Sequence, residues 1–402
     1  MESGRKNAKS NGVSELAPPE WIEAPEQLDE WIEYCAAQTV LAVDTESDSF
    51  HHYTQKVCLI QMTAGGRDVL IDPLALGKPN LKGLATLFKD PEKIKIFHDA
   101  GYDLLCLKRD FAFSFKNIFD TMLASRILGV TQFGLAHVLN NHFGVKPDKK
   151  YQRSDWSKRP LSAEQISYAR LDTHYLPELL RILQEQLELV DRWDWAQEEF
   201  ERLPKMALKN VSAVPDNVMQ SFWRLKGLRR MSPIERGRCK ELYLMRDKIA
   251  QKYDRPAFKV FPDSLLVDLA QNPPKDLAAV QPRKGLRRAG IEMFGKRIIK
   301  ALDKAEPIRS QDIPKDAGKS RRRRRFMDPK ARQLYEALRQ LRSGKAEELG
   351  IEPEVALSNA VLEELAVRVP KRLSESETWG ILKGWRKPVF AKDITALLAK
   401  SN

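Results

Sequence analysis

Short apolar runs alternate with helical patterns over the first half of the chain. Four runs are short and rich in β-branched residues, which is typical of strands: Leu41–Val43, Val57–Met62, Val69–Ile71 and Ile94–Phe97. Apolar residues recur at helical spacing in Leu104–Leu107, Thr121–Leu128, Leu135–Phe143 and Ala163–Leu189. This alternation predicts an α/β domain over residues 21–210.

The second half is predicted to be all-α. Strand signals fade from about residue 212, and prolines such as Pro256 and Pro262 interrupt long helical patterns. The arginine run Arg321–Arg325 repels itself and does not pack, so residues 308–328 are predicted to form a flexible basic linker. Residues 1–20 are polar and lack the apolar segment of a secretory signal, so they are predicted to be a disordered extension.

The helical half contains an internal repeat with an offset of 96 residues and no gap. Recurring pairs include Leu242 and Leu338, Arg246 and Arg342, Leu266 and Leu362, Pro274 and Pro370, and Phe294 and Phe390. Most recurring positions are apolar or helix-breaking, so the repeat encodes a core and its turns. We therefore expect two copies of one small helical domain, at 211–307 and 329–402. This is a duplication and not a solenoid, which would need three or more units.

Charge is concentrated in the middle of the chain. The net charge is +13, but residues 211–330 carry +16 and the remainder carries −3. A localised basic field suggests a polyanionic partner, although a solvated helical surface stays open. Candidate phosphate contacts are Arg224, Lys226, Arg229, Arg230, Arg236, Arg238, Arg287, Arg288, Lys296 and Arg297.

The cysteine spacing and the length of the apolar runs argue against a zinc-binding or membrane-spanning protein. The four cysteines form no CxxC pair and no zinc-binding spacing. No apolar run approaches the roughly 18 residues that span a bilayer. We therefore expect a reduced, cytoplasmic protein with no membrane partner.

Acidic residues on three predicted elements could form one metal site. Asp44 and Glu46 are two apart at the end of a strand, so they share a face. Tyr168 and Asp172 are four apart on a helix and also share a face. Asp103 enters a third, helical element. Carboxylates suit Mg²⁺ or Mn²⁺, and two such ions about 3.5–4 Å apart can clamp the attacking and leaving oxygens of a phosphodiester. Each pair alone is a weak signal, whereas the ordered set is much stronger.

These motifs resemble the ribonuclease D branch of the DEDD exonuclease superfamily. The motifs are Asp44-Thr45-Glu46 with Leu59-Ile60-Gln61, His98-Asp99-Ala100 with Asp103, Tyr168 with Asp172, Phe119-Asp120-Thr121, and Ser154-Asp155-Trp156 with Arg159-Pro160-Leu161. Both helical repeats resemble the HRDC domain. The match extends over nearly the whole chain, in the order found in the bacterial enzymes.

The resemblance implies a ribonuclease H-like fold, with a mixed five-stranded sheet flanked by helices. It implies a 3′→5′ exoribonuclease that releases nucleoside 5′-monophosphates. Asp44 would bridge both ions, Glu46 and Asp172 would complete the site of the ion that activates water, Asp103 would support the second ion, and Tyr168 would position the nucleophile.

The substrate contacts implied by the resemblance are less specific. Gln61 and His98 would touch the terminal nucleotide, and Lys149 would meet a phosphate. A packed role for His98 and a solvated role for Lys149 stay open. Substrates would be RNAs with single-stranded 3′ tails, such as tRNA precursors.

Other functions are compatible with parts of the sequence. A DNA 3′ exonuclease is the nearest alternative, because no reader of the 2′-hydroxyl is evident. A non-catalytic RNA-binding protein with a relic nuclease domain is another. Lys150-Tyr151-Gln152 is similar to the eukaryotic exosome nucleases, but two HRDC copies favour the bacterial type. Gly290–Arg297 nearly spells a phosphate-binding loop, yet Arg297 replaces the required Ser or Thr, so no nucleotide cofactor is expected.

Five acids near the motifs are expected to be structural: Asp48, Asp99, Asp110, Asp120 and Asp155. Asp120 precedes a predicted helix and is expected to cap it. Asp155 is expected to fix a loop beside Trp156.

Overall fold

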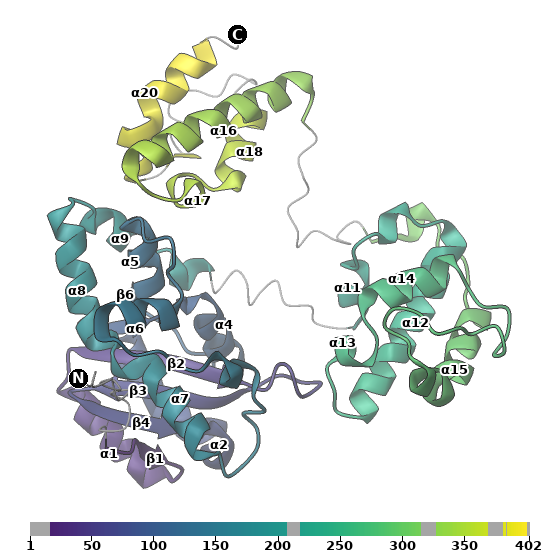
Figure 1. The fold of residues 1–402 in the computed structure, drawn as a ribbon, viewed down its shortest axis with the longest axis horizontal. Coiled ribbons are helices and arrows are strands. Elements are labelled where there is room, and N and C mark those ends of the chain that lie inside the picture. The colour runs from purple at the N-terminus through teal and green to yellow at the C-terminus, as the bar shows by residue number, and fades with distance from the viewer. Residues whose placement is uncertain (1–16, 207–217, 315–326, 369–380, 383, 400–402) are drawn as a thin grey trace, which may run out of the picture. The chain divides into compact units, whose positions relative to one another are not determined.

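The computed structural model describes residues 17–206, 218–314, 327–368, 381–382 and 384–399 (Figure 1). The chain divides into two compact units. The first comprises Met1–Ser47, Val57–Val211 and Arg324–Asn402, and the second comprises Asp48–Lys56 and Ser212–Arg323. Within the part of the chain that is described, no helix combines the length and the apolar character needed to cross a membrane.

A mixed six-stranded sheet forms the centre of the first unit. The strands are β1 (Glu20–Ile22), β2 (Val40–Ser47), β3 (Val57–Ala64), β4 (Arg67–Ile71), β5 (Ile94–Phe97) and β6 (Ile118–Asp120), in the order β1-β4-β3-β2-β5-β6. β3 is antiparallel to both β2 and β4, and the other neighbours are parallel. The α/β prediction is confirmed, but the expected five strands are wrong. Strands β1 and β6 have three residues each, too few for an alternating pattern to show.

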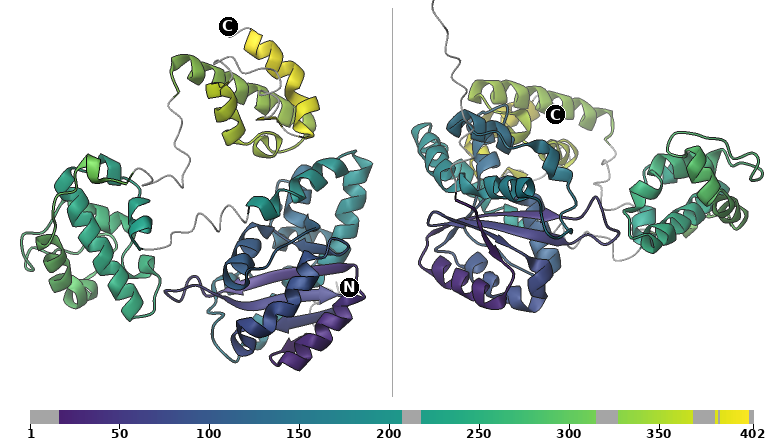
Figure 2. Two further views of the ribbon diagram at one scale, coloured as in Figure 1. Left: turned by 180° about the vertical axis from the view of Figure 1, so that it is seen from behind. Right: turned by 60° about the horizontal axis from the view of Figure 1, so that its bottom comes forward.

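Helices cover both faces of this sheet (Figure 2). One face packs against α1 (Pro25–Ala36), α2 (Pro73–Asn80), the 3₁₀ turn η2 (Leu81–Gly83), α3 (Leu84–Lys89) and α4 (Ala100–Phe111). The other face packs against α5 (Thr121–Ile127), α6 (Leu135–Phe143), α8 (Leu176–Leu189) and α9 (Trp193–Phe200). Leu41 and Val43 of β2 belong to the first core and Ala42 to the second, as the period of two requires.

The predicted helix over Ala163–Leu189 is two helices. Helix α7 (Ala163–His174) ends at Tyr175, and α8 begins at Leu176. Pro177 stands in the first turn of α8, where its missing N–H is tolerated. It could not continue α7, because its ring would clash with a carbonyl one turn earlier. This break gives α7 its own orientation on the sheet.

The duplicated helical domain is present in both units. The first copy contains α11 (Val218–Trp223), η4 (Leu228–Arg230), α12 (Pro233–Lys252), α13 (Ala257–Val260), α14 (Asp263–Gln271), α15 (Arg288–Asp303) and η5 (Ser310–Asp312). The second contains α16 (Pro329–Leu349), α17 (Pro353–Ala356), α18 (Asn359–Arg368) and α20 (Arg386–Ala399). Helices α16, α17 and α18 each begin 96 residues after α12, α13 and α14. The repeat is therefore confirmed.

Two details of the first copy bear on the predictions. Gly290–Arg297 lies inside α15, so it forms no phosphate loop, as expected. Arg236 is buried and donates to the carbonyl of Ile308 at 2.8 Å, so its proposed contact with phosphate is wrong. The basic linker falls mostly outside the described residues.

The second copy shares an apolar core with α5, α8 and α9 of the first unit. The rings of Trp195 and Trp385 stack with centroids 4.2 Å apart and an interplanar angle of 8°. Arg126 forms an ion pair with Glu352 at 2.7 Å. This copy is consequently part of the compact body that contains the sheet.

Candidate active site

The end of β2 presents two carboxylates on one face of the sheet. Asp44 and Glu46 flank Thr45, whose hydroxyl donates to Asp103 Oδ1 at 2.5 Å. The register with β3 places Gln61 opposite Asp44, and the Gln61 amide donates to Asp44 Oδ2 at 3.3 Å. Alternating positions of one strand therefore hold Asp44 and Glu46 toward one point and tether Asp103 through the residue between them.

Three elements bring acids together here. Asp44, Glu46 and Asp172 of α7 each offer a carboxylate oxygen, and these oxygens lie within 4.8 Å of one another. Asp103 enters from the first turn of α4 and is buried. It stands outside that set of three, but its charge is close enough to raise the pKa of Asp44.

In the absence of cations, crowding and burial disfavour the ionised form of the carboxylates in this site. Burial raises the pKa of Asp44 well above its usual range, and the charges of Asp103 and Asp172 raise it further. Burial likewise raises the pKa values of Glu46 and Asp172, and it raises that of Asp103 to about 7. Four such acids can all be ionised only beside compensating positive charge. Asp103 and Asp172 are buried, and Asp44 and Glu46 are partly buried. These hard oxygen donors, whose charges repel one another, fit divalent cations.

Tyr168 shares α7 with Asp172, one turn earlier. Its ring lies beside those of Trp156 and Tyr151, with centroids 6.1 Å away in each case. Burial, and then the charge of Asp172, raises the pKa of Tyr168, so its hydroxyl remains protonated at neutral pH. Gln152 hydrogen bonds to this hydroxyl. Sequence reasoning assigned Gln152 no role in the site, because it lies in the 3₁₀ helix η3 (Lys149–Arg153), outside the three acidic motifs.

Asp68 on β4 anchors α7 to the sheet. It accepts hydrogen bonds from Arg170 Nε at 2.6 Å, from His174 Nδ1 at 2.8 Å and from Thr63 Oγ1 at 2.8 Å. Burial by itself would raise the pKa of Asp68, but hydrogen bonds from His174 and Thr63 outweigh it, and the net shift is downward. This buried ionic cluster fixes the helix that carries Tyr168.

Comparison with known proteins adds family evidence to this geometry. Residues 19–188 match the family model described as 3′-5′ exonuclease, and residues 235–302 and 331–398 each match that of the HRDC domain. Ribonuclease D of Jannaschia sp. is 30% identical over 388 residues, which cover 94% of this chain and 95% of that protein. This chain belongs to the ribonuclease D family. It is accordingly a 3′→5′ exoribonuclease of the ribonuclease D type, as its motifs predicted.

Two other known proteins are also similar to this chain. Exosome complex exonuclease RRP6 of Saccharomyces cerevisiae is 33% identical over 272 residues, which cover 65% of this chain and 37% of that longer protein. The crystal structure of Escherichia coli RNase D, described as an exoribonuclease involved in structured RNA processing, superposes with a TM-score of 0.68 at 23% identity. The match covers 96% of this chain and 99% of that one, so the two share a fold.

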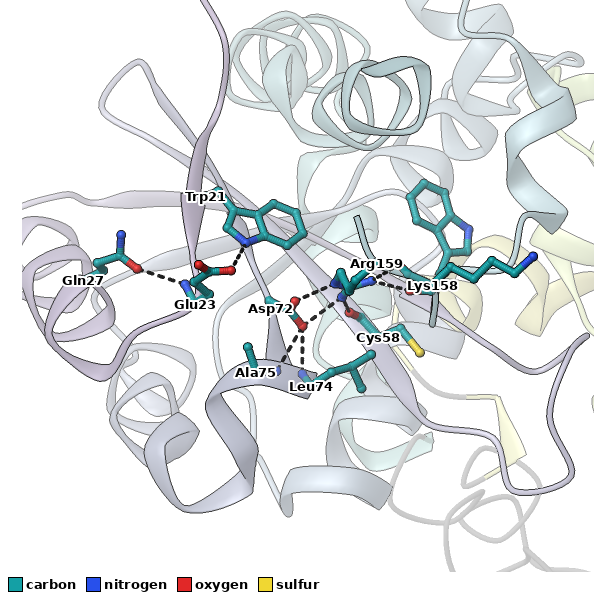
Figure 3. Close-up of polar contacts among 10 residues, drawn as sticks. Trp21, Glu23, Gln27, Cys58, Asp72, Leu74, Ala75, Lys158 and Arg159 are labelled. Carbon is teal, nitrogen blue, oxygen red and sulfur yellow. Dashed lines mark hydrogen bonds and ion pairs between the residues drawn. The ribbon is translucent and has the colours of Figure 1, made fainter. Parts of the chain in front are cut away.

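A ribonuclease D signature around Arg159 proves to be a structural anchor (Figure 3). The Arg159 guanidinium pairs with both carboxylate oxygens of Asp72, at 2.6 and 2.8 Å, and donates to the carbonyls of Cys58 and Trp156. Asp72 also caps α2 by accepting from the backbone N–H of Leu74. These bonds fix the segment that carries Trp156 and hold its indole beside Tyr168.

A cavity of about 640 Å³ opens beside this anchor. Its lining includes Trp21, Asp72, Arg159 and Leu161. The Arg159 guanidinium lies 5.4 Å from the Trp21 ring centroid and is already paired with Asp72. The Asp72–Arg159 pair in this lining serves the fold of the nuclease domain.

The three predicted substrate contacts differ in their surroundings. Gln61 is buried against Asp44, as described above. His98 is partly buried, with Nδ1 2.8 Å from the Thr121 hydroxyl, and burial lowers the pKa of His98 to about 4. Lys149 is exposed in η3. Their contacts with RNA stay predictions.

Two of the five acids that were expected to be structural, Asp120 and Asp155, make the predicted kind of contact. Asp120 caps α5 by accepting from the backbone N–H of Leu123 at 2.9 Å. Asp155 accepts from the Ser157 hydroxyl at 2.6 Å and closes its loop. Both predictions are confirmed, and neither residue belongs to the metal-binding set.

Proposed function

We propose that this ribonuclease D family member hydrolyses RNA from the 3′ end by a mechanism that uses two divalent cations. Asp44, Glu46, Asp103 and Asp172 would hold Mg²⁺ or Mn²⁺. The observation that carries the proposal is the convergence of four acids, of which Asp103 and Asp172 are buried and Asp44 and Glu46 are partly buried; the pKa values of all four are raised. When bound, such ions lower the pKa of water and neutralise the charge that develops on the phosphate.

The protein side chains around the ions supply orientation. The protonated Tyr168 hydroxyl would donate to the attacking water or to a phosphate oxygen, since its pKa is raised and Gln152 holds it in place. Gln61 fixes the rotamer of Asp44, and Thr45 fixes that of Asp103. Attack on the last phosphodiester, with the 3′ oxygen as leaving group, would release a nucleoside 5′-monophosphate at each step.

The substrate would be RNA with a single-stranded 3′ tail, and tRNA precursors are the candidates that the family resemblance favours. The nuclease domain, residues 21–210, would carry out the hydrolysis. The helical domains, residues 211–307 and 329–402, would contribute to holding the RNA. The net positive charge of residues 211–330 supports this division of labour.

A direct test uses a 5′-labelled single-stranded RNA with either a free 3′-hydroxyl or a 3′-phosphate block, and a DNA oligonucleotide of the same sequence. Stepwise shortening of the free RNA alone, abolished by EDTA and restored by Mg²⁺ or Mn²⁺, is the expected result. Internal cleavage products, or undiminished activity in EDTA, would contradict the mechanism. Equal shortening of the DNA would favour a general 3′ exonuclease instead.

A further inference from the structure

A cationic groove runs between α12 and α15 of the first HRDC copy. It encloses about 360 Å³, and Leu244 and Ile249 contribute to its apolar floor. Its rim carries five basic residues: Lys248, Lys252, Arg297, Lys300 and Lys304. Glu241 is the acid among the described residues that line it.

The rim cations are available to a ligand. All five side chains belong to exposed residues. Within the described part of the chain, none of the five has an acidic partner at ion-pair distance, and Glu241 pairs weakly with Lys240 at 3.9 Å. Lys248 and Lys252 lie one turn apart on α12, and Lys304, the C-cap of α15, follows Lys300 of that helix by four residues, so each helix presents neighbouring cations along the groove. Five like charges around one hollow repel one another, and a polyanion would relieve that repulsion.

The second HRDC copy provides an internal comparison, because its helices α16, α17 and α18 begin at the same offset of 96 residues. The groove residues Lys248, Lys252, Arg297 and Lys300 correspond there to Gly344, Glu348, Asp393 and Ala396. The two acids of the second copy hold Lys345, at 2.9 Å from Glu348 and 3.5 Å from Asp393. The same domain therefore folds with two of these cations replaced by acids and two by uncharged residues, so these four cations of the first copy are not needed for folding.

We propose that the α12–α15 groove of the first copy binds the phosphate backbone of single-stranded RNA, and that the equivalent surface of the second copy does not. The proposal rests on the proposed function, since it takes RNA as the substrate. Rows of cations on two facing helices suit successive phosphates, and the apolar floor suits a sugar or a base face. Such a site is insensitive to sequence and strongly sensitive to salt.

The second copy also supplies the test substitutions. We would compare wild type with the double variant Lys252→Glu/Arg297→Asp, which installs the two residues that the second copy carries at these positions. The matched control is Lys259→Glu/Lys275→Glu, which changes the net charge by the same amount at exposed positions of the same copy. Thermal unfolding of all three full-length proteins checks that they fold.

The measurement is fluorescence anisotropy of a 5′-labelled 20-nucleotide oligo(U) RNA in EDTA, over a range of salt concentrations. We expect the groove variant to bind at least about tenfold more weakly at low salt. The slope of log K against log[salt] should fall by about 1.4, since each lost phosphate contact contributes about 0.7 for a single strand. The control should change affinity by less than about threefold. An equal loss in the control, or no loss in the groove variant, would overturn the proposal.

Two further measurements distinguish RNA binding in the groove from hydrolysis at the active site and from the binding of an acidic protein. Cleavage of a trinucleotide, whose few phosphates the active site itself would hold, should be the same in wild type and the groove variant. Because binding is measured in EDTA, it tests the groove even if no hydrolysis is found. A poly-glutamate peptide tests the other occupant: if the groove variant loses affinity for this peptide and none for RNA, the groove serves an acidic protein and the proposal fails.

Discussion

Arg246 and Arg342 make the same pair of hydrogen bonds in the two helical domains, 96 residues apart. Each Nη1 donates at 2.9 Å to a backbone carbonyl 15 residues later, that of Phe261 or Leu357. Each also donates to a side chain 17 residues later, Asp263 at 2.7 Å or Asn359 at 2.8 Å. The charged Asp263 of one copy corresponds to the neutral Asn359 of the other. The duplicated feature is therefore this pair of hydrogen bonds between helices, called the clasp below, and not an ion pair.

The clasp predicts a stability effect. Replacing Arg246 or Arg342 by Met should lower the free energy of unfolding by about 2–4 kcal/mol, because a buried carbonyl loses its donor. Urea denaturation and local hydrogen exchange in α14 or α18 would measure the loss. Arg339→Met is the matched control, since Arg339 makes only an exposed i,i+3 pair among the described residues, and should change stability by less than about 0.5 kcal/mol. Equal effects of all three substitutions would contradict the clasp.

The carboxylate site predicts that Asp44→Asn separates hydrolysis from folding. Hydrolysis of a 3′-hydroxyl RNA should fall by at least about 10³-fold, a loss of about 4 kcal/mol in transition-state stabilisation. The cation-free variant should be at least as stable as wild type, because one of four mutually repelling acids is gone. Its thermal stabilisation by Mg²⁺ should shrink. The exposed Asp29→Asn variant should match wild type in both assays, and undiminished turnover in Asp44→Asn would refute the site.

Tyr168 predicts a change in rate with little change in stability. Tyr168→Phe keeps the ring contacts with Trp156 and Tyr151 and removes only the hydroxyl. We expect kcat to fall about 10²-fold, the usual scale for a positioned proton donor, with a melting temperature close to that of wild type. Tyr151→Phe serves as the control and should leave kcat nearly unchanged. A Tyr168→Phe enzyme with wild-type kcat would remove Tyr168 from the mechanism.

The raised carboxylate pKa values predict how pH acts on the cation-free protein. The pKa of Asp103 is about 7 in the folded state, against an unfolded value of about 3.9. A raised folded pKa stabilises the protonated form, so its contribution is complete below pH of about 4 and is lost as pH rises through about 7. The melting temperature in EDTA should therefore fall over this window less in Asp103→Asn than in wild type.

Divalent cations should reverse that loss and release protons. Binding requires ionised carboxylates, so at pH 7 each bound ion displaces protons from the acids whose pKa values are raised. Calorimetric titration of Mn²⁺ in two buffers of different ionisation enthalpy would count the protons. A proton count of zero would show that the carboxylates are already ionised without the metal.

The Arg159 anchor predicts an indirect effect on catalysis. Removing Arg159 leaves Asp72, whose side chain is 3% exposed, without its counter-ion. Arg159→Met should cost about 3 kcal/mol of stability and should also lower kcat, because Trp156 loses its support beside Tyr168. The double variant Arg159→Met/Asp72→Asn should recover part of the stability. Additive losses in the double variant would show that the two residues are not coupled.

Local sequence patterns predicted the acidic residues and the tyrosine of the site, but not the residues that hold them in position. The period of two placed Asp44 and Glu46 on one face, and the helical period did the same for Tyr168 and Asp172, because both relationships are set within a few residues. Arg170 and Asp68 are 102 residues apart in the chain, and their pairing depends on how α7 crosses the sheet, which no local spacing encodes. Gln152 was named only as part of a family signature and was given no place in the site for a related reason, since a 3₁₀ helix five residues long has no periodic signature.

The gapless offset between the two helical domains has a practical consequence. Because the segments 235–302 and 331–398 have equal length, exchanging one for the other leaves the length of the chain unchanged. A chimera that carries the first domain in both places would keep the chain length and would lack Trp385 and Glu352, so it would show how much their contacts with the nuclease domain contribute.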